Sequence, residues 1–368
     1  MQIKKNKTLT IDKKNRDGRY PLLQAINNND LDTISVILEY SKEKNEILNI
    51  NETNNDGQYP LLWAVHKNNT YLVKILLTYA NDNHIELNIN AKNKSGWYPL
   101  LRAVDNNNIE IVKLLREYAF KHNINLDINE KNKLGDYPIL KAIKKDNINI
   151  IKILMLYSTK KNYTLNINEK IRNGNYPLLA AIDEENIDIV KLLMKYSKER
   201  GYILNINEKG KDGCSPLLLA IKKNNTKIVK LLKDYTTTNN NLMNINVKNN
   251  KKDYPLLMAY KKNNNTIVNL LMKYSKDENI ILNIMDKNED GWYPLSQVVY
   301  SGNVKGFKLL KDYAKQKKIV LNLNDKISYD YIDTPFLCAI EKGNIQMLKL
   351  IINYSISNNV LLDFNKKK

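Results

Sequence analysis

Nine prolines occur in this chain of 368 residues, and all of them lie at one phase of a single repeat. The first eight follow one another at intervals of 39 residues, and the last interval is 41 residues. They are Pro21, Pro60, Pro99, Pro138, Pro177, Pro216, Pro255, Pro294 and Pro335. A constant period in the range of roughly 20–50 residues indicates a stack of similar supersecondary units. The chain is therefore expected to be a solenoid, in which each repeat contacts its neighbours.

Each repeat combines a glycine turn with two predicted helices. A glycine three residues before the proline, such as Gly57, suits a turn position with positive φ. The proline suits the first turn of a helix, and the apolar spacing after it predicts a helix of about two turns. A break rich in Asn precedes a second amphipathic helix, as in residues 109–118. The segment Leu48-Asn-Ile-Asn51 and its copies alternate apolar and polar residues, which predicts a short extended segment.

A tyrosine closes the second helix of every repeat. The copies are Tyr40, Tyr79, Tyr118, Tyr157, Tyr196, Tyr235, Tyr274, Tyr313 and Tyr354. We expect each ring to pack between successive repeats, with its hydroxyl at the surface.

These residues resemble the ankyrin repeat, whose pattern is a glycine turn, Thr-Pro-Leu-His-x-Ala, and a second helix with Ile-Val-x-x-Leu-Leu. Here Gly57-Gln-Tyr-Pro60-Leu-Leu-Trp-Ala64 and Leu72-Val-Lys-Ile-Leu-Leu77 fall in register with it. The resemblance covers essentially the whole chain in nine copies. It implies an all-α solenoid, an ankyrin-like stack of helix-turn-helix repeats joined by extended, hairpin-like turns. We expect one array over residues 1–368, with repeats that start near residues 17, 56, 95, 134, 173, 212, 251, 290 and 331.

The chain departs from the family pattern in three ways. Tyr mostly replaces the Thr before proline and Leu replaces the His, so the usual side-chain hydrogen bonds of that corner should give way to apolar packing. The period is 39 residues against the family's 33, and the extra residues, as in Ser41-Lys-Glu-Lys-Asn-Glu46, should lengthen the second helix. Lys252 and Ile332 stand where the seventh and ninth repeats should have the turn glycine.

The net charge of +19 permits two interpretations. Clustered lysines attract nucleic acid or another polyanion. The alternative is a coding bias toward Asn and Lys, with the asparagines in variable linkers. The pair Asp183-Glu184 stands between lysine pairs such as Lys144-Lys145 and Lys222-Lys223, which favours a protein partner over a polyanion.

Composition also constrains the location and the chemistry. No apolar run reaches the ~18 residues of a membrane span, and Cys214 and Cys338 lie three repeats apart, too far for a disulfide within one solenoid. We expect an intracellular protein, in the cytoplasm rather than the nucleus, and a monomer. The three histidines His66, His84 and His122 form no zinc motif, and no phosphate loop occurs. We expect no catalytic, cofactor or metal site.

The resemblance implies that the turn tips and the first helices line a concave groove that binds a partner protein. All three tryptophans of the chain fall on these positions, which are three residues after and two residues before the proline. Because Trp and Arg are enriched in interface hot spots, we expect Trp63 and Trp97 to lie near each other, flanked by Arg102. The full set of candidate contacts is Trp63, Trp97, Arg102, Trp292, Lys141, Lys144 and Lys145. The sequence thus predicts a non-enzymatic scaffold or adaptor for an unidentified protein, with nucleic-acid or other polyanion binding as the alternative.

Overall fold

The computed structural model describes residues 13–239, 241–328 and 334–363. By its internal contacts the chain divides into unit 1, Met1–Ile167, and unit 2, Asn168–Lys368. Within the described ranges the regular elements are all α-helices, without a β-strand, so the all-α prediction is confirmed.

Short and long helices alternate along the chain. The short helices of unit 1 are α1 (Pro21–Asn28), α3 (Pro60–His66), α5 (Pro99–Asp105) and α7 (Pro138–Lys144). Its long helices are α2 (Leu31–Lys44), α4 (Thr70–Asp82), α6 (Ile109–Lys121) and α8 (Ile148–Lys161). The short helices of unit 2 are α9 (Pro177–Asp183), α11 (Pro216–Lys222), α13 (Pro255–Lys261), α15 (Pro294–Tyr300) and α17 (Pro335–Glu341). Its long helices are α10 (Ile187–Glu199), α12 (Thr226–Thr238), α14 (Asn265–Asp277), α16 (Val304–Gln316) and α18 (Ile345–Ser357).

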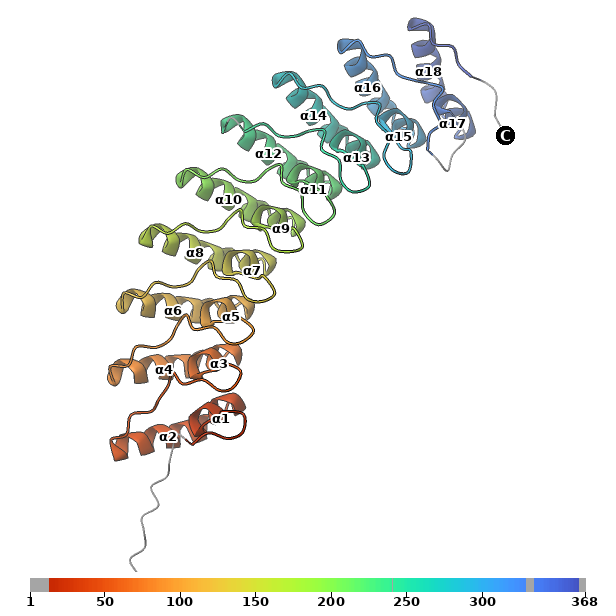
Figure 1. Cartoon of the computed structure of the whole chain (residues 1–368). Coiled ribbons are helices and arrows are strands. Elements are labelled where there is room, and N and C mark those ends of the chain that lie inside the picture. The colour runs from red at the N-terminus through yellow and green to blue at the C-terminus, as the bar shows by residue number, and fades with distance from the viewer. Residues whose placement is uncertain (1–12, 240, 329–333, 364–368) are drawn as a thin grey trace, which may run out of the picture. The chain divides into compact units, whose positions relative to one another are not determined.

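Within each unit, like helices pack on like. In unit 1, α1, α3, α5 and α7 contact one another in succession, and α4, α6 and α8 do the same. Unit 2 repeats this arrangement with α9 through α17 and with α10 through α18. In Figure 1 each unit accordingly shows one row of short helices beside one row of long helices. The apolar faces of both rows meet between them, and this interior is the core of each unit.

The helix starts agree with the sequence prediction. Every short helix begins at its proline, and the long helices continue past the closing tyrosine, as α2 does from Tyr40 to Lys44. Gly57 has a φ of 75°, and a Cβ there would lie 3.0 Å from the Cα of Asn93 in the next repeat. Lys252 adopts the same left-handed conformation, with a φ of 58°, where the seventh repeat lacks glycine. Ile332 and the start of the ninth repeat near residue 331 lie outside the described residues.

The tyrosines before the prolines join the start of a repeat to the extended segment at the end of the same repeat. The ring of Tyr59 is fully buried, and its hydroxyl donates to the backbone oxygens of Asn88 at 2.6 Å and Ala91 at 3.0 Å. Burial raises the pKa of Tyr59 far above its usual value, so the hydroxyl stays a donor. Equivalent bonds are made by Tyr20, Tyr98, Tyr176, Tyr254 and Tyr293. Apolar packing at this corner is thus confirmed, but it comes with a hydrogen bond to the extended segment of the same repeat that the sequence pattern did not predict.

The tyrosines that close the long helices correct a second expectation. The hydroxyls of seven of them accept a hydrogen bond from a backbone N–H in the preceding repeat, so these hydroxyls are not at the surface. Tyr118, for example, accepts from the amide of Leu87 at 2.9 Å. The same bond is made by Tyr79, Tyr157, Tyr235, Tyr274, Tyr313 and Tyr354. The reason is that an extended segment runs under the ring and has a backbone donor to satisfy.

An asparagine in each Leu-Asn-Ile-Asn segment clamps the next repeat. The Asn129 side chain donates to the oxygen of Thr164 at 2.6 Å and accepts from the amide of Asn166 at 2.9 Å. The same pair of bonds is made by Asn51, Asn90, Asn168, Asn207, Asn246 and Asn324. Met285 holds this position in the seventh repeat and cannot make them. The alternation of the segment is confirmed, with Leu48 and Ile50 buried, but its polar partners are backbone groups of the next repeat.

Asparagines have two further fixed positions. Before the long helices they are N-caps, as where Asn108 accepts from the amide of Ile111 at 3.0 Å. In the turns their side chains accept from amides two and four residues on, as Asn54 does from Asp56 and Gln58. The expectation that asparagines lie in variable linkers is wrong for these positions, because each position has a defined hydrogen-bonding role.

Candidate functional site

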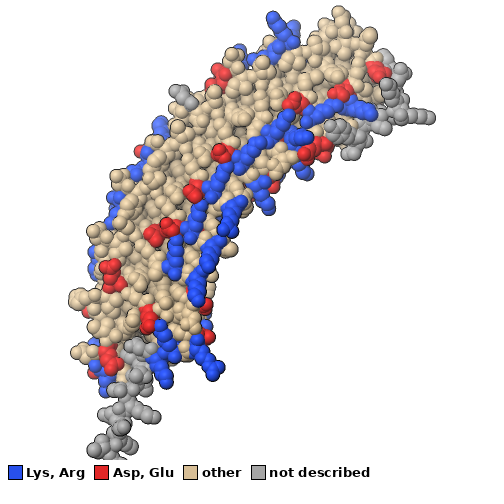
Figure 2. Space-filling view, viewed as in Figure 1, with Lys and Arg blue, Asp and Glu red and all other residues tan. Residues whose placement is uncertain are grey.

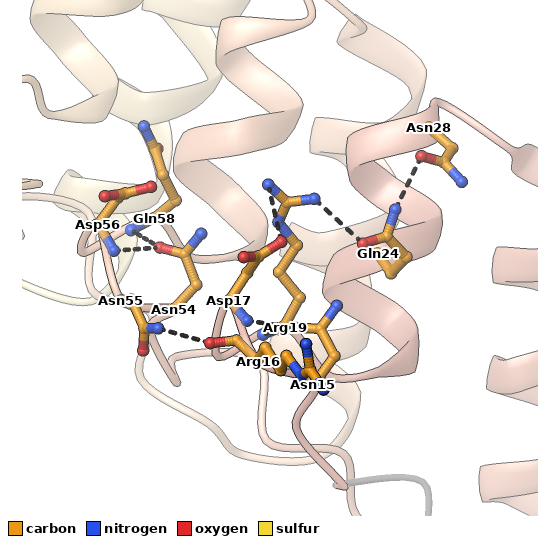
Figure 3. Close-up of polar contacts among 10 residues, drawn as sticks. All are labelled: Asn15, Arg16, Asp17, Arg19, Gln24, Asn28, Asn54, Asn55, Asp56 and Gln58. Atoms are coloured by element: carbon orange, nitrogen blue, oxygen red, sulfur yellow. Dashed lines mark hydrogen bonds and ion pairs between the residues drawn. The ribbon is translucent and has the colours of Figure 1, made fainter.

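Trp63 lies on α3 with two cations near its ring. The guanidinium carbon of Arg19 is 5.4 Å from the ring centroid, and the Lys67 ammonium is 5.8 Å from it. Figure 3 shows how Arg19 is held: it pairs with Asp17 at 3.7 Å and donates to Gln24 at 3.3 Å. The tryptophan is half-buried, so part of its ring is accessible to a ligand beside the two cations.

Trp97 lies at the turn of the third repeat, under Arg102 of α5. The guanidinium carbon of Arg102 is 3.6 Å from the ring centroid, and the same group donates to Asp105 at 3.3 Å. Only 16% of the Arg102 side chain is exposed, and this burial lowers the pKa of Arg102, against the effect of Asp105. The stack therefore fixes both the ring and the cation.

The predicted lysines lie in the same part of unit 1, but with carboxylates between them. Lys141 contacts Asp136 at 2.7 Å and Asp105 at 3.4 Å, and its ammonium is 5.8 Å from the Trp97 ring. Lys144 lies 3.5 Å from Asp136, and Lys145 lies 3.9 Å from Asp105. These lysines thus belong to an ion-pair network with a mixed charge.

We call Arg19, Trp63, Lys67, Trp97, Arg102 and Lys141 the cation–tryptophan cluster. The two tryptophan rings make no ring–ring contact in the described part of the chain, since each faces its own cations. His66 lies beside the cluster: burial lowers its pKa, and the charges of Arg102 and Lys67 lower it further, while Asp105 raises it. Sequence reasoning missed the roles of Asp105 and Asp136, although Asp136 occupies the position two residues before the proline, where Trp97 lies in the preceding repeat.

Trp292 belongs to unit 2 and has different neighbours. Its ring meets that of Tyr300 edge-on at a centroid distance of 5.0 Å, and the Lys342 ammonium lies 4.1 Å from the Tyr300 centroid. Trp292 is half-buried, so this third candidate is also a partly accessible aromatic group at a turn.

A series of lysines on the connecting segments was not recognised from the sequence. Each contacts an acidic residue 38 positions later, in the next repeat. The pairs are Lys14 with Glu52, Lys92 with Glu130, Lys170 with Glu208, Lys248 with Asp286, and Lys287 with Asp325. Figure 2 shows Lys and Arg side chains in rows along the visible face of each unit. The pairing indicates that some of the many lysines form ion pairs between adjacent repeats.

The described residues form no metal site, disulfide or membrane-spanning helix. In residues 13–239, 241–328 and 334–363, no cluster of three or more His, Cys, Asp or Glu side chains could hold a metal ion. Cys214 and Cys338 are buried free thiols. None of the described helices combines the length and the apolar character needed to cross a membrane.

The repeats of this chain match one family of known proteins. A sequence model of ankyrin repeats (three copies) matches residues 3–86, 22–127, 119–203, 161–244 and 200–284. No curated protein sequence matches the chain. Among solved structures, the ankyrin repeat domain of Bcl-3, titled a unique member of the IkappaB family, is 19% identical, with a TM-score of 0.49; the match covers 70% of this chain and 99% of that one. An ankyrin repeat domain from Acinetobacter baumannii AYE is 23% identical, with a TM-score of 0.47, and covers 59% of this chain and 98% of that one. Because the sequence model matches more than half of its length, the chain belongs to the ankyrin repeat family.

Proposed function

We propose that this chain is a non-enzymatic adaptor that binds a partner protein through the cation–tryptophan cluster of unit 1. Ankyrin repeats are generally protein–protein interaction modules, and no catalytic activity is indicated for this chain. The observation that carries the proposal is the pair of half-buried tryptophans, Trp63 and Trp97, on successive repeats, with cations fixed on their faces. Such aromatic and arginine side chains supply most of the binding energy in protein interfaces.

The charges around the cluster favour a protein over a polyanion. Asp105 and Asp136 lie among Arg102, Lys141 and Lys144, so a uniform row of phosphates would meet carboxylates as well as cations. A protein surface can match such an alternating pattern, with charges that set the orientation and aromatic groups that provide contact area.

The proposal includes the organisation and location of the chain. The 39-residue period runs unbroken from Pro138 to Pro177, which supports one array of nine repeats that works as a monomer. The two buried free thiols support an intracellular location, in the cytoplasm.

A pulldown from source lysate tests the function, with and without nuclease. The natural chain is compared with Trp63→Ala/Trp97→Ala, and with a control in which the exposed Tyr71 and Leu156 of the long helices become Ala. Circular dichroism verifies that all three are folded. We expect one or more proteins to survive nuclease treatment, to persist with the control and to be lost with the tryptophan variant.

Two results would contradict the adaptor. If the captured proteins bind the tryptophan variant as well as the natural chain, the cluster is not the contact. If recovery collapses with nuclease and ignores the tryptophans, the lysine-rich surface binds nucleic acid and the alternative holds.

A further inference from the structure

Unit 2 has two adjoining hollows on the side of its turns and short helices. One lies between the fifth and sixth repeats with a volume of about 330 Å³, and the next lies between the sixth and seventh with about 630 Å³. Asp212 and Lys222 line both, so the hollows form one continuous depression, which we call the unit 2 groove. It contains none of the residues of the cation–tryptophan cluster.

The floor of the unit 2 groove is apolar. Leu179, Leu219 and the thiol of Cys214 line the first hollow, and Met258 lines the second. Leu219 is half-buried and the other three are almost fully buried. An apolar side chain of a ligand placed here would bury its own apolar surface and that of the groove. This favours an occupant with apolar groups.

The rim of the groove carries an excess of positive charge. Six lysines line it, Lys211, Lys222, Lys223, Lys251, Lys261 and Lys262, against Asp183, Asp212 and Asp253. Lys223 pairs with Asp183 at 2.9 Å and Lys222 with Asp212 at 3.4 Å, while Asp253 accepts from the Asn288 amide at 2.8 Å. The other four lysines have no carboxylate partner in the described part of unit 2. The groove is therefore complementary to an acidic occupant.

The repeat spacing defines the shape of that occupant. Helices α9, α11 and α13 pack in succession, and packed helices lie roughly 8–10 Å apart. An extended chain in the polyproline II conformation advances ~3.1 Å per residue with three residues per turn, so side chains three residues apart lie on one face and about 9 Å apart. One apolar side chain in each hollow thus matches every third residue of an extended segment.

We propose that the unit 2 groove binds an extended acidic peptide segment with apolar side chains three residues apart. The apolar floor distinguishes this occupant from a nucleic acid, because phosphates would gain nothing from contact with apolar side chains. The surface is separate from the cluster of the proposed adaptor function, and either can fail without the other.

A selection experiment identifies the peptide sequences that the groove prefers. A display library of random 12-residue peptides is selected on the full chain, and the best binder is made as a fluorescein-labelled peptide for anisotropy titration. We expect enriched sequences with an excess of Asp and Glu and with apolar residues at i and i+3. Salt should weaken the binding, because exposed lysines provide the attraction.

The affinity of substituted chains then tests whether the peptide binds in the groove. Reversing two unpaired rim charges in Lys211→Glu/Lys261→Glu should weaken binding about tenfold or more. Leu219→Ser should weaken it by about fivefold through lost apolar contact, with the salt dependence unchanged. The matched control Lys227→Glu/Lys230→Glu reverses two exposed charges at the start of α12 and should leave the affinity as it was. Trp63→Ala/Trp97→Ala should also have no effect on this peptide.

Three outcomes would overturn the proposal. Selected peptides without acidic excess would show that the rim charges do not select the ligand. Equal losses in the groove and control variants would show that only the net charge of the chain matters. Displacement of the peptide by a 12-nucleotide oligodeoxythymidylate, at a similar concentration to that of unlabelled peptide, would identify the groove as a polyanion site.

Discussion

The guanidinium of Arg102 covers one face of the Trp97 ring, with 3.6 Å between its central carbon and the ring centroid. The same guanidinium reaches Asp105, which in turn lies within ion-pair distance of Lys141 and Lys145. Under the proposed adaptor function, a partner protein meets the guanidinium on this face of the indole, so we expect the arginine and the ring to be recognised together.

The stack should be measurable as a coupling energy. Trp97→Ala, Arg102→Ala and the double variant form a double-mutant cycle, read by urea unfolding with circular dichroism. We expect a favourable coupling of about 0.5–2 kcal/mol, because the cation is largely removed from water over the ring. A coupling energy smaller than about 0.3 kcal/mol would mean that the two groups stabilise the fold independently.

The buried tyrosine before each proline should be sensitive to loss of its hydroxyl. Tyr59→Phe leaves the ring in place but removes the donor to the oxygens of Asn88 and Ala91. We expect a loss of about 1 kcal/mol in the free energy of unfolding, since these part-buried backbone acceptors lose their partner. The control is Tyr71→Phe, whose side chain is 62% exposed, and it should unfold at the same urea concentration as the natural chain. A matching decrease in both variants would attribute the effect to something other than the bond.

The asparagine clamp should determine how strongly adjacent repeats are joined. Asn129→Ala removes the bonds to the oxygen of Thr164 and the amide of Asn166, and we expect a cost of about 1–2 kcal/mol. Hydrogen exchange gives the local readout, with faster exchange expected at the amide of Asn166. Asn269→Ala, at an exposed position on α14, serves as the comparison and should alter neither quantity. Unchanged protection at Asn166 would rule out the clamp as a constraint.

Acid should destabilise unit 1 through His66. Burial and the charges of Arg102 and Lys67 lower its pKa below the usual 6.5, so the unfolded chain takes up the proton first. Stability is therefore expected to fall as pH drops through 6.5 and to level off once the folded protein is protonated as well. His66→Gln should remove this part of the pH dependence and leave stability above about pH 7 unchanged.

Nuclear magnetic resonance titration separates the causes of this shift. The pKa of His66 should rise in Arg102→Met, which removes a positive charge, and fall in Asp105→Asn, which removes the opposing carboxylate. Shifts of the opposite sign would show that the charges around His66 are arranged differently.

Local constraints made part of this fold predictable from the sequence. Proline restricts its own φ and lacks an N–H, so the start of each short helix could be read directly at positions such as Pro60. Glycine at a turn with positive φ is equally local, as Gly57 illustrates. The long helices followed from apolar spacing, and their extension past Tyr40 followed from the extra residues of the repeat.

Contacts between repeats could not be predicted in the same way. The hydroxyl of Tyr118 bonds to the amide of Leu87, 31 positions away, and nothing in either residue type specifies that bond. Asn has three different roles in the repeats, as helix cap, turn residue and clamp. Without the structure, its abundance therefore cannot be told from a composition bias. Asp105 and Lys141 occupy different positions of successive repeats, and their pairing depends on how those repeats stack.

The asparagine clamp also has a consequence for how such a chain can change its length. Within unit 2 each clamp, from Asn168, Asn207 or Asn246, reaches backbone groups of the following repeat, whose amide and carbonyl are present whatever side chains that repeat carries. A 39-residue cassette could therefore be duplicated or excised at this junction, and the ends would rejoin with the same bonds. Met285 is the one described member of the series without the amide. A duplication or excision at its repeat boundary would therefore start from a junction that lacks both of these hydrogen bonds.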